Sequence, residues 1–420
     1  MSMNGPVDGR ERNLREWDFV WLWAGAAISL SEIWAGGLLA SFGLLAGLGI
    51  IGLGHGVGNT PMALGGLIGS RHGVPAIVGT RGALGNRGST LPAVLNIAQL
   101  VGWTGVMLWI GGQAAAGLAG GEGSAQGWIV ALGVLTTLWA LGGSRVWRRL
   151  QRIGVALLLL LSVAMTALAL WTYGWRGLLA APSAPEMPFM LGLDLVIAMP
   201  ISWMPLVSDY TRHAAVPGGG IRGTWGGYFL VSSWMYAVGL IAAIATGSGA
   251  PEAMLMRLMG EHRLWLPAVG IVLLSTATTT FLDIYSNAVS AQSLFPKVGA
   301  RPLVLLGGVA GTLIALFFDA TRFEGFLLFI GAAFCPLFGV VLADYFVLKR
   351  GRYVAEDLFR RGRYWYVGGV NGRAMAAWGA GFAIYRWCSV TGFAGGSSIP
   401  SMLAAAALYL AISNGKREKA

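Results

Sequence analysis

Apolar residues dominate the chain in a series of long runs, separated by short polar, basic or glycine-rich stretches. A helix needs roughly 20 apolar residues to cross the hydrocarbon core of a bilayer. Runs of about this length lie at about 17–40, 44–69, 90–119, 127–142, 152–174, 189–210, 222–246, 264–292, 302–319, 323–348, 374–393 and 399–414. The pattern predicts an all-α polytopic membrane protein with about twelve transmembrane helices.

The first run carries polar residues at its centre. Ser29, Ser31 and Glu32 lie in the middle of WLWAGAAISLSEIWAGGLLA, with glycines on both sides. A carboxylate near the middle of a bilayer costs several kcal/mol unless it is paired, protonated or facing a polar cavity. We therefore expect an interrupted first helix whose polar groups face a site inside the protein, as in secondary transporters.

The sixth run, 189–210, contains Pro200 and Pro205, and we expect these prolines to interrupt it as well. Interrupted helices at corresponding positions of two halves indicate an inverted-repeat transporter. The expected organisation is an N-terminal cytoplasmic tail at 1–16, a first repeat at 17–174, a second repeat at 175–348, a basic cytoplasmic loop at 349–373, two further helices at 374–414 and a C-terminal tail at 415–420.

Composition supports a membrane protein. Hydrophobic residues make up 55% and charged residues 11% of the chain, against roughly 25% charged residues in soluble domains. The net charge of +11 comes from basic residues concentrated in alternate loops, which favours the cytoplasmic leaflet over nucleic acid as their partner. We expect both termini to be cytoplasmic, in a bacterial-type inner membrane, and no cleaved signal peptide, disulfide framework or obligate protein partner.

The eighth run is the most polar. Ser275, Thr279, Asp283 and Asn287 follow one another at i,i+4 spacing and form one stripe of a helix. Such a stripe does not face lipid. For each hydroxyl, a hydrogen bond between helices is about as good an explanation as a binding site. For Asp283 a functional site is favoured, because a lone buried carboxylate is costly.

Tryptophans at mid-depth suggest a ligand. Trp103 and Trp203 lie near the middle of their runs, where they could stack on a planar heteroaromatic molecule, whereas packing is the favoured role of Trp23 and Trp109. His55 could relay protons, although a helix contact is the commoner role. We find no metalloprotease motif, CxxC pair or phosphate loop, and thus no catalytic constellation.

Four stretches carry a family resemblance: WAGAAISLSEIWAGG, RGALGNRGSTLPAVLNIAQLVGWTGV, ISWMPLVSDYTR and STATTTFLDIYSNAVS. With them the whole chain resembles the nucleobase–cation symporter-1 family, and within it the hydroxymethylpyrimidine (thiamine precursor) permease branch. The resemblance implies a LeuT-type fold with two inverted five-helix repeats and two extra C-terminal helices. It also implies alternating access and no enzymatic activity.

The resemblance also implies site residues. The substrate ring would stack between Trp103 and Trp203, and Ser29 and Met107 occupy the positions of amides that contact substrate in hydantoin-transporting relatives. No cofactor is expected other than Na⁺ as a possible coupling ion. Its ligands would be the carbonyls of Gly25 and Ile28 together with Ser275, Thr278 and Thr279.

The expected function is import of hydroxymethylpyrimidine together with Na⁺ or H⁺. Either Glu32 or Asp283 would bind the aminopyrimidine edge through a charge-assisted, two-point contact. The main alternative is a permease of the same family for cytosine, a purine or allantoin. A membrane sensor or an intramembrane enzyme explains the two interrupted helices less well.

Overall fold

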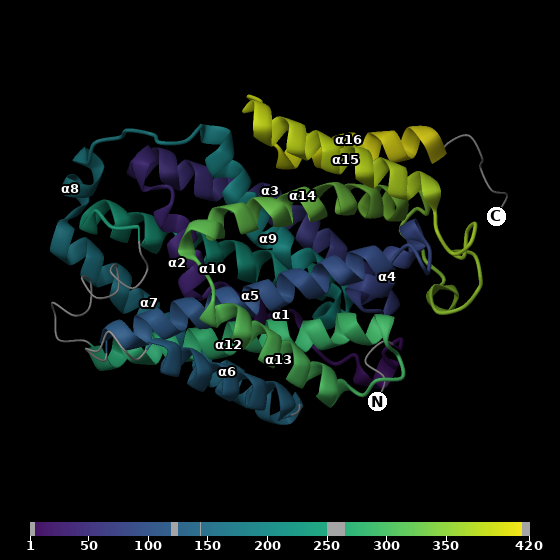
Figure 1. The fold of residues 1–420 in the computed structure, drawn as a ribbon, viewed down its shortest axis with the longest axis horizontal. Coiled ribbons are helices and arrows are strands. Elements are labelled where there is room, and N and C mark those ends of the chain that lie inside the picture. Colours follow the sequence, from purple (N-terminus) through teal and green to yellow (C-terminus); the bar gives the residue numbers. More distant parts are fainter. Residues whose placement is uncertain (1–4, 119–124, 143, 250–264, 414–420) are drawn as a thin grey trace.

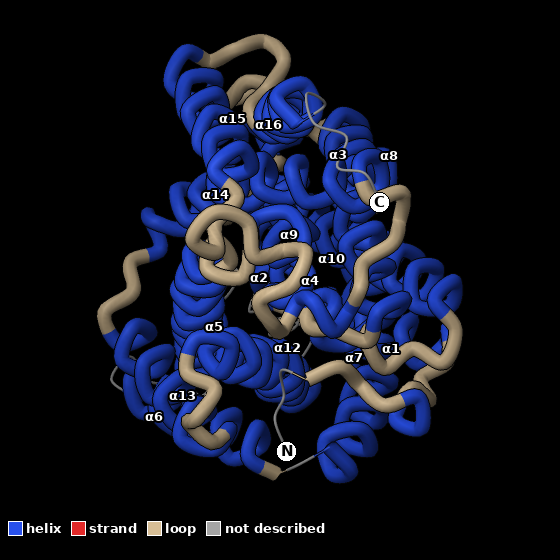
Figure 2. The backbone as a smooth tube through the Cα atoms, turned by 90° about the vertical axis from the view of Figure 1, so that its right-hand side faces the viewer, coloured by secondary structure: helices blue, strands red, loops and turns tan. Residues whose placement is uncertain are grey.

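The computed structural model describes residues 5–118, 125–142, 144–249 and 265–413, and the predicted tail 415–420 lies outside them. No strand occurs in these ranges, as Figure 2 shows. The helices are α1 (Glu16–Ala27), α2 (Leu30–Gly37), α3 (Leu44–His72), α4 (Ala76–Leu84), α5 (Thr90–Leu118), α6 (Ala125–Leu141), α7 (Ser144–Tyr173), α8 (Trp175–Ala180), α9 (Phe189–Thr211), α10 (Pro217–Thr246), α12 (Trp265–Leu294), α13 (Ala300–Leu316), α14 (Phe323–Leu342, continued by a π-helix over Ala343–Leu348), α15 (Gly372–Thr391) and α16 (Ser398–Ser413).

Each predicted apolar run falls on one of these helices, or on the pair α1 and α2. The long helices lie roughly side by side, with α15 and α16 together at one edge of the bundle (Figure 1). By length and hydropathy, α5, α7, α9, α10 and the segment Ala320–Leu348 are each able to cross a membrane, as is the pair α1 and α2 taken together. The helices α6, α13 and α16 are apolar but shorter.

The predicted interruption of the first span is present. Helix α1 ends at Ala27, Ser29 is extended with φ −141° and ψ 155°, and α2 begins at Leu30. The two helices meet at an angle of 60°. The Ser29 hydroxyl accepts a hydrogen bond of 3.3 Å from the backbone N–H of Glu32, which is the usual way in which serine caps a helix N-terminus.

The predicted interruption of the sixth span is wrong. Helix α9 runs without a break through Pro200 and Pro205. Packing on all sides overrides the local effect of the prolines: α3 lies so close that a Cβ on Gly58 would come within 2.5 Å of the Pro200 ring. The α5 amides of Gln99 and Asn96 donate to the α9 carbonyls of Ser202 (2.8 Å) and Pro205 (3.4 Å).

Glycines bring α10 against the broken first span. A Cβ on Gly36 would overlap the carbonyl of Tyr236, and a Cβ on Gly239 would overlap the carbonyl of Ile33. The backbones of α2 and α10 can approach this closely only because both positions lack side chains, a common feature of membrane helix pairs. As a result, the polar centre of the first span faces α10.

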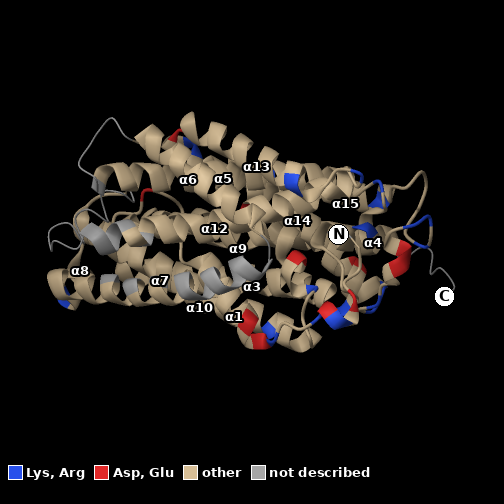
Figure 3. Cartoon of the chain, turned by 90° about the horizontal axis from the view of Figure 1, so that it is seen from below, with Lys and Arg blue, Asp and Glu red and all other residues tan. Residues whose placement is uncertain are grey.

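Lys and Arg gather at one end of the bundle (Figure 3). Segments that the sequence assigns to the same side of the membrane meet there. Arg81 of α4 donates to the carbonyl of Leu358 (3.0 Å), and the Arg87 guanidinium lies 5.4 Å from the centre of the Trp365 ring. Val7, near the N-terminus, donates from its backbone N–H to Gly73 O (2.9 Å). The basic segment 349–371 is therefore packed onto α4.

Candidate functional site

Helix α5 holds the first predicted stacking residue, Trp103, which is buried. The ring of Trp103 meets Phe326 of α14 edge-on at 5.2 Å and Phe323 at 6.2 Å. Its indole N–H has no hydrogen-bond partner among the described residues. A buried donor without a partner costs about 1–3 kcal/mol, so this N–H is a candidate ligand contact.

Helix α9 holds the second, Trp203. Its neighbour Ser202 accepts the hydrogen bond from Gln99, one helical turn before Trp103. The two tryptophans are thus carried at the same crossing of α5 and α9, although among the described residues no direct ring contact joins them. The Trp203 ring instead meets Trp23 edge-on at 5.6 Å, so Trp23 has the packing role that the sequence favoured.

A file of aromatic rings leads from Trp103 toward one end of the bundle. Phe323 stacks on Trp34 with ring centres 4.1 Å apart and an interplanar angle of 9°. Trp34 stacks on Trp109 at 5.9 Å, and Trp109 lies 5.5 Å from Phe318. Trp109 therefore belongs to this file, and its packing role agrees with the sequence prediction.

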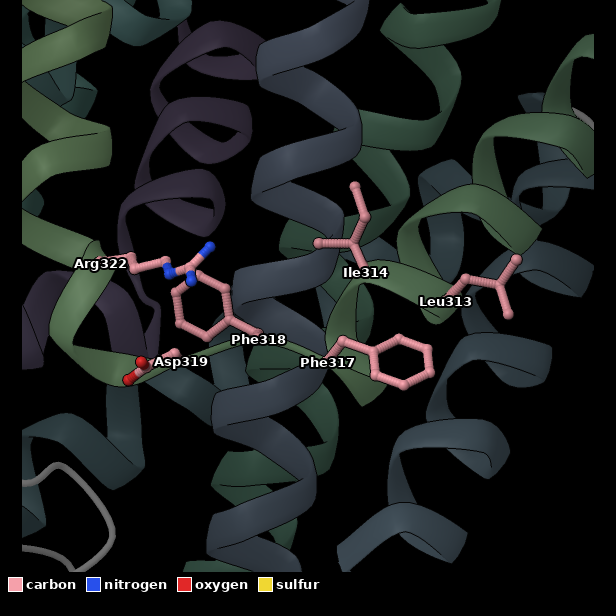
Figure 4. A pocket seen from close by; sticks show the side chains of 6 residues that line it. All are labelled: Leu313, Ile314, Phe317, Phe318, Asp319 and Arg322. Carbon is pink, nitrogen blue, oxygen red and sulfur yellow. The ribbon is translucent and has the colours of Figure 1, made fainter.

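The file ends at a hollow of about 380 Å³, lined by Leu313, Ile314, Phe317, Phe318, Asp319 and Arg322 (Figure 4). Asp319 accepts a hydrogen bond of 3.0 Å from the backbone N–H of Thr321, and this bond lowers the pKa of the Asp319 carboxyl below its usual value. The hollow is mainly apolar, with one cation and one anion at its edge. Its wall consists of the end of α13 and the link from α13 to α14.

Helix α12 carries the predicted polar stripe, and all four of its members are buried. Asn287 donates to the carbonyl of Ile97 on α5 (3.2 Å), which is an interhelical tie. In contrast, one carboxylate oxygen of Asp283 and the hydroxyl of Thr279 have no partner among the described residues. The stripe is therefore structural at one end and has unpaired polar atoms at its centre.

Two contacts show how α5 and α12 are aligned along the bundle. Ile97 meets Asn287, and a Cβ on Gly111 would lie 2.5 Å from the Thr276 hydroxyl, so the two helices run antiparallel. Between these two contacts, Trp103 on α5 comes level with Asp283 on α12. An aromatic ring and a buried carboxyl group are therefore found at a similar level in the bundle.

Glu32, the other predicted carboxylate, is already bonded within the protein. Its Oε1 accepts a hydrogen bond from the Tyr228 hydroxyl (2.6 Å), and its Oε2 lies 2.7 Å from the Ser232 hydroxyl. Ser232 also lies 2.6 Å from Nε2 of His55. Sequence reasoning missed Tyr228 and Ser232. Their i,i+4 spacing on α10 was the available signal, but nothing in the sequence paired α10 with α2.

The two remaining predicted contacts, Ser29 and Met107, are buried as well. The Ser29 hydroxyl caps α2 and lies 2.9 Å from the Ser31 hydroxyl. Met107 is buried on α5, one turn beyond Trp103.

The predicted Na⁺ ligands lie on α1 and α12, which pack against each other. Gly25 and Ile28 are buried at the end of α1. On α12, Thr278 donates to the Leu274 carbonyl (2.8 Å) and lies 3.2 Å from the Ser275 carbonyl. The hydroxyl of Thr279 has no partner among the described residues, so Thr279 is a better candidate cation ligand than Thr278.

One motif has a structural role that the sequence did not indicate. In SDYTR, the Asp209 carboxylate accepts a hydrogen bond of 3.1 Å from the backbone N–H of Ala76, the first residue of α4. Arg212 donates from Nε to the Asp209 carbonyl (3.1 Å). The motif thus caps the short helix at the charged end of the bundle.

Residues 6–410 match the family of permeases for cytosine/purines, uracil, thiamine and allantoin. The chain belongs to this family. It is 24% identical to the hydantoin permease of Microbacterium maritypicum over 406 residues, which are 91% of this chain and 83% of that protein. It is 29% identical to the cytosine permease of Escherichia coli strain K12 over 294 residues, which are 69% and 67% of the two chains.

Among solved structures, the fold is similar to that of Mhp1, a nucleobase–cation-symport-1 family transporter, in a closed conformation with bromovinylhydantoin bound. The TM-score is 0.87 at 22% identity, covering 99% of this chain and 95% of that one. The predicted family and the predicted LeuT-type fold are confirmed. The protein is a membrane transporter and not an enzyme.

Proposed function

We propose that the protein imports a pyrimidine-type heterocycle by cation symport, with hydroxymethylpyrimidine as the preferred substrate. The observation that carries this proposal is a set of unpaired buried polar atoms on α5 and α12, near the level of Trp103 in the bundle. These are the Trp103 indole N–H, the Oε1 of Gln99 and one carboxylate oxygen of Asp283. Buried polar atoms are normally hydrogen-bonded, so a polar ligand is the natural partner for this group.

An aminopyrimidine matches the group in both shape and hydrogen bonding. Its flat ring suits stacking on Trp103 and Trp203. Its amino group donates, which suits the carboxyl oxygen of Asp283 and the Oε1 of Gln99, both without a partner among the described residues. Glu32 is less suited to this role because Tyr228 and Ser232 already bind both of its oxygens. Asp283 is therefore the proposed recognition residue.

For the coupling ion, a Na⁺ site formed by the Gly25 and Ile28 carbonyls with Thr279 is supported by the break between α1 and α2 and by the unpaired hydroxyl. Hard cations prefer such oxygen ligands. We also infer that the end rich in Lys and Arg faces the cytoplasm of a bacterial-type inner membrane, because cytoplasmic loops are enriched in these residues. Both chain termini would then be cytoplasmic.

Binding to the purified protein tests the proposal. Tryptophan fluorescence is recorded while hydroxymethylpyrimidine, cytosine or allantoin is added. We expect saturable quenching by hydroxymethylpyrimidine at the lowest concentration, and about tenfold or more weaker binding for Asp283→Asn, equivalent to about 1.4 kcal/mol.

The matched control is Asp194→Asn, another buried aspartate, whose two oxygens accept from the backbone N–H groups of Ser397 and Ser398. It should bind like the wild type. Tighter binding of cytosine or allantoin would move the protein to another substrate class within the family. Equal affinity of Asp283→Asn and wild type would remove Asp283 from the site.

A further inference from the structure

Three helices contribute to one continuous hydrogen-bond chain in the interior. Glu32 of α2 bonds to Tyr228 and Ser232 of α10, and Ser232 bonds to His55 of α3. The other ring nitrogen of His55, Nδ1, lies 3.0 Å from the carbonyl of Ile51. The Glu32, Ser232 and His55 side chains are buried.

The donors in this chain can be counted. A carbonyl only accepts, so Nδ1 of His55 must carry a proton and donate to Ile51. In a neutral imidazole, Nε2 is then an acceptor. Ser232 has a single hydroxyl proton but two close neighbours, Nε2 of His55 at 2.6 Å and Oε2 of Glu32 at 2.7 Å. With neutral His55 and ionised Glu32, one of these two contacts would bring acceptor against acceptor.

One additional proton resolves the conflict. If Oε2 of Glu32 is protonated, it donates to Ser232, Ser232 donates to His55, and His55 donates to Ile51. Oε1 remains free to accept from Tyr228, so every contact is a hydrogen bond. The other arrangement, an imidazolium and a carboxylate separated by a serine, requires two buried charges without direct contact, which is strongly unfavourable.

We propose that Glu32, Ser232 and His55 form a proton-binding site that holds one proton on Glu32 in this conformation and exchanges it during the transport cycle. The second half of this statement rests on the proposed transport function, whereas the first half does not. Besides His55 and Tyr228, the titratable group that faces the site is Tyr236 of α10, whose ring meets His55 edge-on at 4.8 Å. Within the described residues, no Lys or Arg makes a hydrogen bond or ion pair with Glu32.

The site has a direct link to the proposed substrate site. The Trp203 indole N–H donates to the Tyr228 hydroxyl (2.9 Å), so the Tyr228 proton is directed to Oε1 of Glu32. Movement of Trp203 on substrate binding or release would alter this contact and with it the proton affinity of Glu32. A charge inside the span would also cost less once the site opened to water, which favours release of the proton from an open state.

Infrared spectroscopy of the full-length purified protein tests occupancy without any substrate. The spectrum of Glu32→Gln is subtracted from that of the wild type at neutral pH. We expect a protonated-carboxyl C=O band that belongs to Glu32, and we expect Ser232→Ala to shift this band because its hydrogen bond is lost. The control, Tyr236→Phe, keeps the ring against His55 and should leave the band unchanged. A carboxylate signal in its place would overturn the proposal.

Proteoliposomes test exchange. Internal pH is followed with a trapped dye while hydroxymethylpyrimidine is added outside. We expect acidification with wild type and Tyr236→Phe, and at least a tenfold smaller signal with Glu32→Gln. Substrate entry without acidification in the wild type would overturn the exchange step. If no heterocycle binds or enters at all, the proposed function fails, while the infrared result still decides whether the proton site exists.

Discussion

The indole N–H of Trp203 donates a hydrogen bond of 2.9 Å to the hydroxyl of Tyr228, which in turn donates to Glu32 at 2.6 Å. A single hydroxyl on α10 therefore joins a predicted substrate-stacking ring on α9 to a carboxyl group on the broken first span. The Trp23 ring also packs edge-on against both Trp203 and Tyr228. Rearrangement of α2, α9 or α10 would change these two hydrogen bonds.

Removal of that hydroxyl should weaken both the fold and the site. In Tyr228→Phe, the buried Trp203 N–H loses its acceptor and Glu32 loses a donor, at a cost of about 1–3 kcal/mol for each unpaired group. We expect a lower melting temperature in detergent and weaker substrate quenching. Tyr236→Phe is the matched control, because the Tyr236 hydroxyl is buried without a partner among the described residues. Equal losses in both variants would contradict the role given to Tyr228.

Two glycine-to-alanine substitutions should change stability in opposite directions, because only one of the glycines lies in the close contact between α2 and α10. In Gly239→Ala the new methyl group would overlap the Ile33 carbonyl, and overpacking of this kind typically costs about 1–3 kcal/mol. In Gly56→Ala the methyl group meets no atom within 4 Å, and helix propensity should add up to about 1 kcal/mol of stability. Thermal unfolding followed by tryptophan fluorescence measures both. A stable Gly239→Ala protein would show that the helices separate easily.

Replacement of Thr279, whose hydroxyl is unpaired among the described residues, distinguishes a role in ion binding from a role in stability. Thr279→Val keeps the shape and removes a buried hydroxyl that has no partner, so stability should stay the same or rise. The apparent affinity of Thr279→Val for Na⁺ should nevertheless fall by about tenfold, equivalent to about 1.4 kcal/mol. Substrate quenching titrated against Na⁺, with choline as the replacement ion, provides the measurement.

The control for this variant is Thr104→Val on α5. Its hydroxyl donates to the Leu100 carbonyl (2.8 Å) within its own helix, and its loss should leave the Na⁺ response as it is. An unchanged Na⁺ response of Thr279→Val would refute the proposed ligand.

Removal of the Asp209 cap should destabilise the start of α4 locally. Asp209→Ala removes the acceptor from the N-terminal N–H of α4, which typically costs about 1 kcal/mol. Hydrogen exchange of the backbone amides at 76–79 should accelerate, while exchange on α5 stays slow. Asp319→Ala serves as the control, since Asp319 is exposed and lies beside η4 (Ala320–Arg322), far along the chain from α4. Slow exchange of α4 in Asp209→Ala would mean that its packing alone holds the helix.

Features that depend on neighbouring residues, or on the repeat of apolar positions along a helix, could be predicted from the sequence. The apolar runs predicted the helices because a span must be continuously apolar. The SLSE centre of the first span predicted its break because a carboxylate at mid-membrane must face a polar site, and the neighbouring glycines allow the helix to open. The burial of Asp283 also followed, since its stripe could not face lipid. Trp23 and Trp109 have the packing roles that were favoured for them.

Features that depend on the contact between distant helices could not be predicted. The prolines of α9 suggested a break, but α3 and α5 hold this helix continuous, and no local pattern reveals such packing. The partners of Glu32 lie about 200 positions further along the chain on α10. Without that pairing, Glu32 and Asp283 were equivalent candidates, whereas the structure separates them by their hydrogen bonds.

Uptake into proteoliposomes tests the central claim most directly. Labelled hydroxymethylpyrimidine is offered to vesicles that contain the wild type, Trp103→Ala or Asp283→Asn, under an inward cation gradient, with unlabelled cytosine and allantoin as competitors. The account predicts saturable, gradient-driven uptake by the wild type that falls at least tenfold in both variants and is inhibited most strongly by hydroxymethylpyrimidine itself. Uptake that is equal in all three proteins, or that is independent of any cation gradient, would contradict it.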